Sequence, residues 1–473
     1  MSSDVRTRAA PIAPIDLSTP QKLHVVGVGG PGMSAIAIVL REMGHTVSGS
    51  DIREKPILDR LRAGGVEVQI EHHRSNVHGV AAVTASSAVP ARNIELDEAR
   101  RQGSLVLSRA GMLAGICAQA RSLAVAGTHG KTTTSSMLML VLGEAGWKPS
   151  FVIGGDVTDM GTGAQWTGGE WLVVEADESD GTHLELPLYG TILTNVEVDH
   201  LDHFGSFQAI VDSFDAYLAQ IPGPKVLCAD DPVCADLAQR HEGITYGLSA
   251  GAQYRATHLR PHDGSFRFTV EHRGQPVGEV RLPLRGTHNV LNATGVVAMA
   301  MSVGIDFHTA AAALARFGGV ARRFDIRGVS DGATLVDDYA HLPSEIAAVL
   351  AAARQSGDDW KRIVAVFQPN RYNRMAELSP AYRDAFVDAD LVVITDIFAS
   401  GTVPIPGITG KLVVNAVLDA HPRTWVAWLP RRVDLIEYLA TVLRAGDVCI
   451  SMGCGDIASL PEEVISRRGR VAR

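Results

Sequence analysis

Short apolar runs alternate with segments of helical spacing along most of the chain. The runs that we expect to form strands are residues 23–28, 46–50, 81–86, 105–108, 123–126, 171–176, 191–196, 334–336, 363–367, 391–395, 425–428 and 448–452, and residues 228–231 are expected to close a further strand. Regular alternation of buried strands with helices is typical of parallel sheets, so the pattern predicts the α/β class. Residues 254–285 differ, because apolar and polar positions alternate there between glycine-containing turns, which predicts a small antiparallel piece.

A glycine-rich segment, GTHGKTTT at residues 127–134, follows one of these strands and precedes a helix expected over 135–144. Glycines allow backbone N–H groups to approach phosphates, and a helix N-terminus adds partial positive charge. We expect Lys131 to reach the β- and γ-phosphates of a nucleotide and the hydroxyl of Thr132 to bind Mg²⁺. The general P-loop pattern is not fully met, since its first glycine would fall at Val125. The alternative is a plain glycine turn between strand and helix.

A second glycine-rich segment, GVGGPG at residues 27–32, lies between the first strand and an apolar helix expected over 33–43. Asp51 follows the next strand, about 20 residues further on, as in the dinucleotide-binding fingerprint. This pattern places a pyrophosphate on the helix N-terminus, and NAD and a UDP-linked ligand both contain one. The alternative is a packing turn in a domain without a ligand. Ser87 follows a further strand, at the edge where open α/β sheets bind ligands.

Carboxylates and imidazoles follow two strands of the central third. Glu175 directly continues one strand, and in the same sheet as a Lys-Thr loop it is the expected second anchor for Mg²⁺. The acidic stretch 177–180 that follows could instead be a solvated turn. His200 lies in DHLDH, residues 199–203, which is either a metal site or a polar helix start. Without sulfur partners or histidines at i,i+4 spacing, Mg²⁺ is favoured over zinc.

Three further segments carry side chains suited to binding. Residues 337–341 (DDYAH) and 368–374 (QPNRYNR) follow strands of the final third. Arg371 and Arg374 would lie one turn apart in a helix and could bind one carboxylate between them; the alternative is a pair of solvated arginines. Residues 288–292 (HNVLN) begin an alanine-rich helix and could either cap it or contact the edge of an adenine.

The composition limits the classes of protein that fit. With 46% hydrophobic and 20% charged residues, the 473 residues suffice for about three globular domains of roughly 150 residues. The net charge of −9 argues against a nucleic-acid partner. Five scattered cysteines without a CxxC pair disfavour zinc and disulfides and suit a reducing compartment. We expect neither a signal peptide nor a membrane span, because no sufficiently long apolar run occurs.

The segments GTHGKTTT, EADESD, TNVEVDHLDH, HNVLNATG, ARRFD, DDYAH and FQPNRYNR occur in this order along the chain. Together they resemble the Mur ligase family of bacterial cell-wall synthesis, over residues 24–456. The segment VGVGGPGMSAIA is similar to the family member that adds L-alanine. After a flexible lead-in (1–20), the resemblance implies a Rossmann-like domain for the UDP substrate (21–118), a central P-loop-type ATPase domain (119–321) and a Rossmann-like C-terminal domain (322–473).

The resemblance also implies a reaction with ATP and Mg²⁺. The lactyl carboxylate of UDP-N-acetylmuramate would attack the γ-phosphate of ATP, and the amine of L-alanine would displace phosphate from the resulting acyl phosphate. This is an early cytoplasmic step of peptidoglycan synthesis, without nucleic acid or membrane insertion. The alternatives are a relative that attaches a tripeptide to the same sugar nucleotide, an NAD-dependent oxidoreductase and a nucleotide-gated binding protein.

The same resemblance implies site residues, position by position. The catalytic residues are Lys131, Glu175, His200 and Asp338, and the ligands of Mg²⁺ are Thr132, Glu175 and His200. The residues for ATP are Gly127, Thr128, His129, Gly130, Lys131, Thr132, Thr133, His288, Asn289, Asn292 and Arg323. Those for the UDP substrate are Gly29, Gly30, Met33, Ser50, Asp51, Ser87 and Arg109. Those for L-alanine are Tyr339, His341, Arg371 and Arg374, with its carboxylate on the arginines.

Three positions depart from the pattern of the alanine-adding member. Leu342, Asn370 and Asn373 stand where that member usually has His, His and Thr. All three lie on the side expected to receive the amino acid. The departures therefore concern which amino acid is accepted rather than the ligase reaction.

Overall fold

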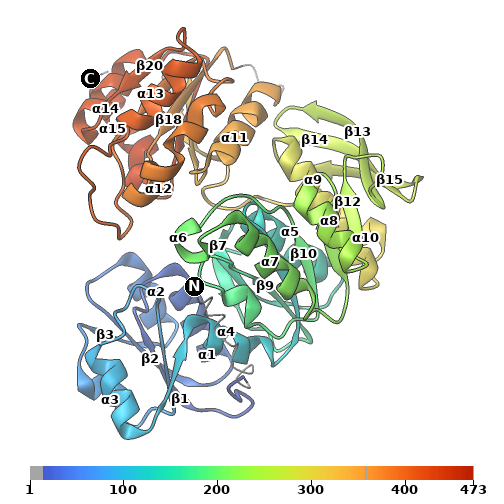
Figure 1. Cartoon of the computed structure of the whole chain (residues 1–473), viewed down its shortest axis with the longest axis vertical. Coiled ribbons are helices and arrows are strands. Elements are labelled where there is room, and N and C mark those ends of the chain that lie inside the picture. Colours follow the sequence, from blue (N-terminus) through green and yellow to red (C-terminus); the bar gives the residue numbers. More distant parts are fainter. Residues whose placement is uncertain (1–13, 159, 357–359, 472–473) are drawn as a thin grey trace, which may run out of the picture.

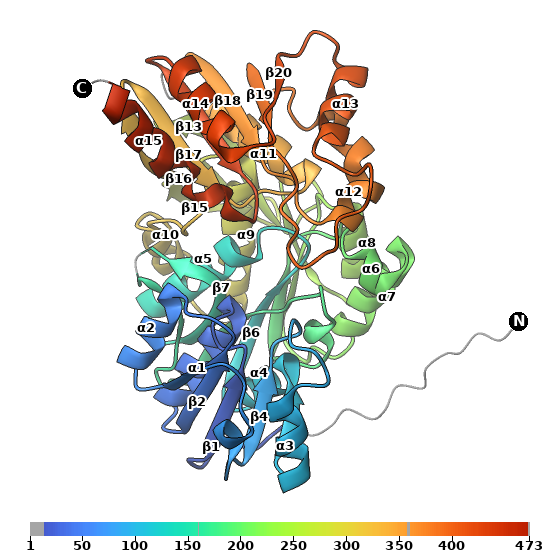
Figure 2. The same cartoon turned by 90° about the vertical axis from the view of Figure 1, so that its left-hand side faces the viewer.

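The computed structural model describes residues 14–158, 160–356 and 360–471, which are built around three separate sheets. The sheets follow one another along the sequence, and the central domain lies between the N-terminal and C-terminal domains (Figures 1 and 2). This architecture confirms the predicted α/β class with three domains.

The N-terminal domain has a parallel five-stranded sheet in the Rossmann-like order β3-β2-β1-β4-β5. Its strands are β1 (Lys22–Val26), β2 (Thr46–Asp51), β3 (Glu67–Ile70), β4 (Ala82–Ala85) and β5 (Leu105–Ser108). Its helices are α1 (Pro31–Glu42), α2 (Pro56–Ala63), α3 (Ile94–Gln102) and α4 (Arg109–Cys117), with a 3-10 turn η1 (Arg74–Val77).

The lead-in expected over residues 1–20 lies partly outside the described residues, which begin at 14. Ile15 and Leu17 lie against Gly115 of helix α4, and Leu17 is 3% exposed. A flexible lead-in is therefore wrong for these residues, because burial of their apolar side chains favours a fixed position.

The central domain has a ten-stranded sheet in the order β15-β14-β13-β12-β11-β10-β6-β9-β7-β8. Its strands up to β12 are β6 (Arg121–Ala126), β7 (Ser150–Val157), β8 (Thr162–Gln165), β9 (Trp171–Glu175), β10 (Gly190–Leu193), β11 (Lys225–Cys228) and β12 (Ile244–Gly247). Its helices are α5 (Lys131–Glu144), α6 (Leu201–Phe204), α7 (Phe207–Leu218), α8 (Pro232–Arg240), α9 (Thr287–Ser302) and α10 (Phe307–Leu314), with a 3-10 turn η2 (Thr182–Leu184).

The predicted antiparallel piece is present as β13 (Tyr254–His262), β14 (Ser265–His272) and β15 (Gln275–Leu282). Phe266, Phe268 and Val270 are buried at alternate positions of β14, as the sequence pattern requires. Strand β13 pairs with β12, so this piece extends the central sheet toward the right of Figure 1.

The C-terminal domain has a six-stranded sheet in the order β16-β17-β21-β18-β19-β20, parallel except for β16. Its strands are β16 (Asp325–Ser330), β17 (Ala333–Asp338), β18 (Arg362–Phe367), β19 (Leu391–Ile394), β20 (Val426–Trp428) and β21 (Asp447–Met452). Its helices are α11 (Pro343–Gln355), α12 (Tyr372–Leu378), α13 (Lys411–Ala420), α14 (Arg432–Val442) and α15 (Leu460–Val471), with 3-10 turns η3 (Ser379–Asp384) and η4 (Asp456–Ser459).

The strands predicted from apolar runs are all present, whereas β3, β7, β8, β12 and β16 were not predicted. These strands lack a clear signal because they are polar, half-exposed or interrupted by glycine, as in EVQI of β3 and SFVIGGDV of β7. Both glycine-rich segments follow the carboxyl ends of parallel strands, β1 and β6, where open α/β sheets bind ligands.

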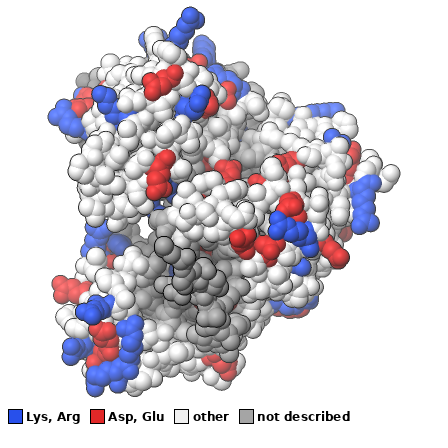
Figure 3. All heavy atoms as spheres, viewed as in Figure 1, with Lys and Arg blue, Asp and Glu red and all other residues white. Residues whose placement is uncertain are grey.

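Charged side chains of both signs are mixed on the one face of the molecule that Figure 3 draws. In the described part of the chain, no helix combines the length and apolar character needed to cross a membrane.

Gly127, the residue that follows β6, provides a test of how tightly the loop is packed. Its φ is +122°, and a Cβ atom there would lie 2.8 Å from the backbone oxygen of Asn195 and still closer to Thr194. We expect Gly127→Ala to reduce the free energy of unfolding by about 2–4 kcal/mol, from overpacking and backbone strain.

Urea denaturation would measure this loss, with Gly143→Ala as the matched control. Gly143 lies in α5 with nothing within 4 Å of an added Cβ, so that alanine should be neutral or stabilising by about 1 kcal/mol. Equal effects of the two substitutions would contradict the close packing of the loop.

Candidate functional site

The loop between β6 and α5, here called the phosphate loop (residues 127–130), is fixed by Asn195, two residues after the end of β10. The backbone N–H groups of Thr128 and His129 donate to the backbone and side-chain oxygens of Asn195, at 3.1 and 2.8 Å. Gly130, with φ of +81°, is the N-cap of α5. The helix begins at Lys131 and not at 135 as predicted, because its first turns are buried although they are polar.

Lys131 is held by its own loop and by a buried carboxylate. Its Nζ atom lies 2.8 Å from Oε2 of Glu178 and 3.3 Å from the backbone oxygen of Thr128. Burial opposes the charge on Lys131, but the carboxylates of Glu178 and Asp177 keep its pKa above the usual value. Glu178 is 4% exposed, so the interpretation of residues 177–180 as a solvated turn is wrong for this residue. The sequence analysis did not identify Glu178 as a site residue.

Glu175 and Thr132 place hard oxygen atoms beside the phosphate loop. Oε1 of Glu175 accepts the N–H of Gly154 at 2.8 Å. Burial raises the pKa of Glu175, whereas the hydrogen bonds from Gly154 and Thr132 and the charge of Lys131 oppose this rise. A carboxylate and a hydroxyl fit Mg²⁺, which takes oxygen ligands and usually keeps several from water or phosphate. The described residues contain no cluster of three or more His, Cys, Asp or Glu arranged to hold a metal ion.

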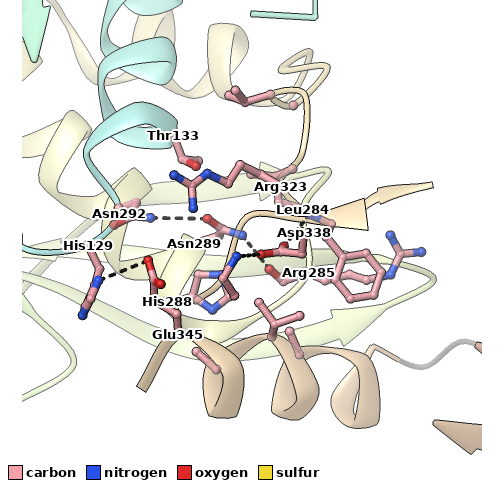
Figure 4. Close-up of a pocket in the computed structure, with 18 of the residues that line it drawn as sticks. His129, Thr133, Leu284, Arg285, His288, Asn289, Asn292, Arg323, Asp338 and Glu345 are labelled. Carbon is pink, nitrogen blue, oxygen red and sulfur yellow. Dashed lines mark hydrogen bonds and ion pairs between the residues drawn. The ribbon is translucent and has the colours of Figure 1, made fainter. Parts of the chain in front are cut away.

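A cavity of about 450 Å³, the nucleotide cavity, lies beside the phosphate loop between the central and C-terminal domains (Figure 4). It brings together most of the residues predicted for ATP and also Asp338. The lining includes His129, Gly130, Thr133, His288, Asn289, Asn292, Arg323, Asp338, Ser344 and Glu345.

Helix α9 presents its first turns to this cavity. Its N-cap is Gly286 and residues 288–292 lie within its first turns, so none of them occupies the N-cap position that the capping alternative requires. Nδ2 of Asn292 donates to Oδ1 of Asn289 at 3.3 Å. Burial, with a smaller effect of the Arg323 charge, lowers the pKa of His288 to about 4, so its imidazole is neutral.

Asp338 connects the two segments of the C-terminal domain that face the cavity. Its carboxylate accepts the N–H of Phe324 at 2.7 Å and that of Ala340 at 2.8 Å. Burial raises its pKa to about 6 against the opposing charge of Arg323. The guanidinium of Arg323 lies 5.1 Å from the ring centre of Tyr339. Arg323 and Tyr339, both predicted to bind ligands, therefore lie close to Asp338.

His129 of the phosphate loop lies between carboxylates of two domains. Its Nε2 atom is 3.2 Å from Glu197 and its Nδ1 atom is 3.2 Å from Glu345 of α11. Burial opposes the charge on His129, but Glu345 and Glu197 raise its pKa to about 9. Sequence reasoning missed both glutamates, although Glu197 lies within the quoted segment TNVEVDHLDH.

A second, much smaller hollow of about 20 Å³ lies between the central segment after β10 and helix α12. We call it the small hollow. It brings together three predicted site residues, His200, Arg371 and Arg374. Its lining is Asp199, His200, Leu201, Arg371, Asn373, Arg374, Glu377 and Leu378. Burial lowers the pKa of His200, which favours its neutral imidazole.

The two arginines of the small hollow differ in their surroundings. Arg374 is 7% exposed and pairs with Asp199 across the domain interface at 2.7 Å, with Asn370 at 3.0 Å. Arg371 precedes α12 with φ of +60°, so the prediction that both lie on one helical turn is wrong. Solvated arginines are also excluded for Arg374, because its charge is already neutralised by a buried carboxylate.

Tyr339 and His341, also predicted to receive the amino acid, do not line the small hollow. Nδ1 of His341 lies 3.1 Å from Glu345, beside the nucleotide cavity. Of the three departures from the family pattern, Leu342 is buried, Asn370 holds Arg374, and Asn373 lines the hollow. Oδ1 of Asn373 is buried without a hydrogen-bond partner among the described residues.

The N-terminal glycine loop is tied to the strand that follows it. Oδ2 of Asp51 accepts the N–H of Gly29 at 2.9 Å, and Lys55 pairs with the same atom at 3.1 Å. The side chain of Met33 is 2% exposed and lies within the core, so only the backbone of Met33 could meet the pyrophosphate as predicted. Ser50 is fully buried and donates to Glu95 at 2.7 Å, so it too is enclosed within the domain.

A hollow of about 260 Å³ lies beside this loop, between the N-terminal and central domains. Its lining includes Gly29, Pro31, Ser34, Arg60, Gly154, Gly155 and Asp156. Gly30 adjoins this lining in sequence, and Ser87 is exposed in the turn after β4.

Arg109, the first residue of α4, joins the N-terminal and central domains. Its Nη2 atom lies 3.0 Å from both Asp177 and Asp180, and its side chain passes beside Gly32 of the glycine loop. The acidic stretch after Glu175 is therefore fixed from both sides, by Arg109 and by Lys131.

Comparison with known proteins agrees with this geometry. The Mur ligase family, catalytic domain, matches residues 22–121, the Mur ligase middle domain matches 125–300, and the Mur ligase, glutamate ligase domain, matches 322–455. The UDP-N-acetylmuramate–L-alanine ligase of Pelobacter propionicus is 43% identical over 94% of this chain and 98% of that protein.

Two crystal structures share the fold over nearly the whole chain. The UDP-N-acetylmuramate–alanine ligase of Thermotoga maritima matches with a TM-score of 0.80 and 28% identity, over 96% of this chain and 100% of that one. A murein peptide ligase of Psychrobacter arcticus matches with a TM-score of 0.67 and 25% identity, over 95% and 99% of the two chains. With three consecutive domain matches and a 43% identical relative, the chain belongs to the Mur ligase family.

Proposed function

We propose that this chain joins L-alanine to the lactyl carboxylate of UDP-N-acetylmuramate, cleaving ATP to ADP and phosphate, in peptidoglycan synthesis. The observation that carries the proposal is the nucleotide cavity beside the phosphate loop, which Lys131 directly follows, at the interface of two domains. The relative from Pelobacter propionicus, which bears this activity in its name, supports the choice of substrates.

The proposed chemistry explains why a buried lysine is needed. A carboxylate is a poor acylating agent, so its oxygen first attacks the γ-phosphorus of ATP, and ADP leaves. The amine of L-alanine then attacks the acyl carbon, phosphate leaves with the bridging oxygen, and a proton leaves the nitrogen. Two anions must meet in the first step, and Lys131 supplies positive charge where the negative charge develops. Closure of the domains excludes water, which would otherwise hydrolyse the acyl phosphate.

We assign the Mg²⁺ that accompanies ATP to Thr132 and Glu175, the oxygen pair beside the phosphate loop. Bound there, the ion would neutralise charge on the phosphates during transfer. His200, with its neutral imidazole, is assigned to a second ion nearer the small hollow. Around the nucleotide, His288, Asn289, Asn292 and Arg323 would bind and orient ATP.

The sugar nucleotide is assigned to the hollow that Gly29 of the N-terminal glycine loop lines, with Gly30 next in sequence and Asp51 bound to the Gly29 N–H. Arg109 lies beside Gly32 of the same loop. The Gly29 N–H is already bound by Asp51, so a pyrophosphate would have to share or replace that bond. A cytoplasmic location is part of the proposal, since ATP is a substrate and all five cysteines are unpaired.

The small hollow is assigned to L-alanine. Within the described part of the chain the side chain of Arg371 makes no ion pair, whereas Arg374 is neutralised by Asp199. Arg371 would therefore take the carboxylate of the amino acid, and the unpaired Oδ1 of Asn373 would accept from its ammonium group. The relative from Pelobacter propionicus, 43% identical and named for L-alanine, favours this amino acid over the tripeptide of the murein-recycling relative.

The test of the function is phosphate release by the purified protein with ATP, Mg²⁺ and UDP-N-acetylmuramate, with each of the twenty amino acids and with the tripeptide. We expect release to be greatest with L-alanine. Lys131→Ala should lower the rate by about 10³-fold, because a charge that stabilises the transition state is lost. The control is Lys411→Ala at the exposed start of α13, which should retain the wild-type rate. Greatest release with the tripeptide would contradict the proposal.

The pKa of Asp338 predicts how the rate depends on pH. With a pKa of about 6, raised from 3.8, the carboxylate is charged above pH 6 and accepts the two N–H groups that position Phe324 and Ala340. Protonation should weaken both bonds, so kcat/KM should fall as the pH decreases through 6.

In Asp338→Asn, kcat/KM should be lower by about 10²-fold, because misplaced binding groups cost orientation, and this inflection should be lost. Asp331→Asn, at an exposed carboxylate of the same domain, should keep the wild-type profile. An unchanged inflection in Asp338→Asn would show that another group titrates.

A further inference from the structure

Glu345, in the first turn of α11, makes two sets of contacts with its two carboxylate oxygens. Oε2 accepts the backbone N–H groups of His341 and Leu342, at 2.9 and 3.0 Å. Oε1 lies 3.2 Å from Nδ1 of His129 in the phosphate loop. One buried side chain therefore holds the DDYAH segment of the C-terminal domain and contacts the ATP-binding loop of the central domain.

The phosphate-loop side of this contact is also ordered. Nε2 of His129 faces Glu197 and the hydroxyl of Ser344, each at 3.2 Å, and Ser344 donates to Glu197 at 2.6 Å. The backbone N–H of His129 donates to Oδ1 of Asn195 at 2.8 Å. His129 is thus held by the central domain on one side and by two consecutive residues of α11 on the other. In Figure 4 the two side chains approach each other from opposite walls of the nucleotide cavity.

We propose that Glu345 is a positioning residue that couples binding of L-alanine between the central and C-terminal domains to binding of nucleotide at the phosphate loop, through its contact with His129. The proposal rests on the ligase function above and adds the connection between its two binding events. Because this contact joins the C-terminal domain to the central domain, it exists only while the two domains lie together. A ligand that binds between them and favours this arrangement would therefore favour binding of the other ligand.

Such coupling has a measurable and reciprocal consequence. If L-alanine favours the closed arrangement, it must tighten the binding of nucleotide, and nucleotide must tighten the binding of L-alanine by the same factor. Coupling between sites in proteins is typically about 5–150-fold. If Glu345 served only as a helix cap, replacing His129 would not change the effect of L-alanine on nucleotide binding.

The experiment titrates a non-hydrolysable β,γ-methylene analogue of ATP by calorimetry, with Mg²⁺ and UDP-N-acetylmuramate present, with and without saturating L-alanine. In the wild type, we expect L-alanine to lower the Kd of the analogue about five-fold or more. In Glu345→Gln, which keeps an oxygen for the cap but loses the charge, this decrease should vanish. His129→Asn changes only the phosphate-loop side and should abolish it equally. The double variant should lose no more of the decrease in Kd caused by L-alanine than either single variant loses.

The matched control is Glu463→Gln, which removes the charge of another paired carboxylate of the C-terminal domain, 2.9 Å from Arg432. It should keep the wild-type decrease. The proposal is overturned if Glu345→Gln retains the decrease, if His129→Asn retains it while Glu345→Gln loses it, or if the wild type shows none.

Amide product is also measured in the same preparations. This measurement distinguishes failure of the proposed role of Glu345 from failure of the proposed ligase function. A wild type that makes product while its variants remain coupled overturns the role of Glu345 alone. A wild type that makes no product overturns the ligase function, and with it the coupling between its two sites.

Discussion

Electrostatic repulsion between two anions is the constraint on which this structure depends. A carboxylate and a triphosphate approach each other only where positive charge is buried and fixed, and such charge is costly to remove from water unless it is paired. Lys131, with 15% of its side chain exposed, meets both demands, since burial opposes its charge while Glu178 and its own loop stabilise it. In the proposed mechanism nucleotide competes with Glu178 for this lysine, which would explain why an acidic residue lies in an anion-binding site.

Pairs of opposite charges also connect the three domains. Arg109 connects the N-terminal domain to the acidic stretch beside the phosphate loop, and Arg374 meets Asp199 between the central and C-terminal domains. His129 and Glu345 form a third contact of this kind. Buried charge pairs are specific in their geometry, since a partner left unpaired is strongly unfavourable. The interfaces that create the binding cavities are therefore held in place by the groups that line them.

Sequence predicted the features that are local in the chain. Both glycine-rich loops, the strand before Glu175 and the antiparallel extension follow from periodicity and spacing within short segments. The residues that were missed or misplaced depend on distant partners. Glu178 looks like part of a solvated acidic turn until Lys131 is placed beside it, and Arg374 looks free until the domains close over Asp199. Met33 matches a binding pattern by position, but the helix turns its side chain into the core.

The central claim is that the carboxylate of the sugar nucleotide is activated by phosphorylation before the amide forms. The most direct measurement uses UDP-N-acetylmuramate labelled with ¹⁸O in its lactyl carboxylate, with ATP, Mg²⁺ and L-alanine, and determines the mass of the released phosphate. An acyl phosphate predicts one ¹⁸O atom in that phosphate, because the oxygen that attacks phosphorus leaves with it. Unlabelled phosphate, formed alongside amide product, would contradict the mechanism and show that ATP is cleaved by water.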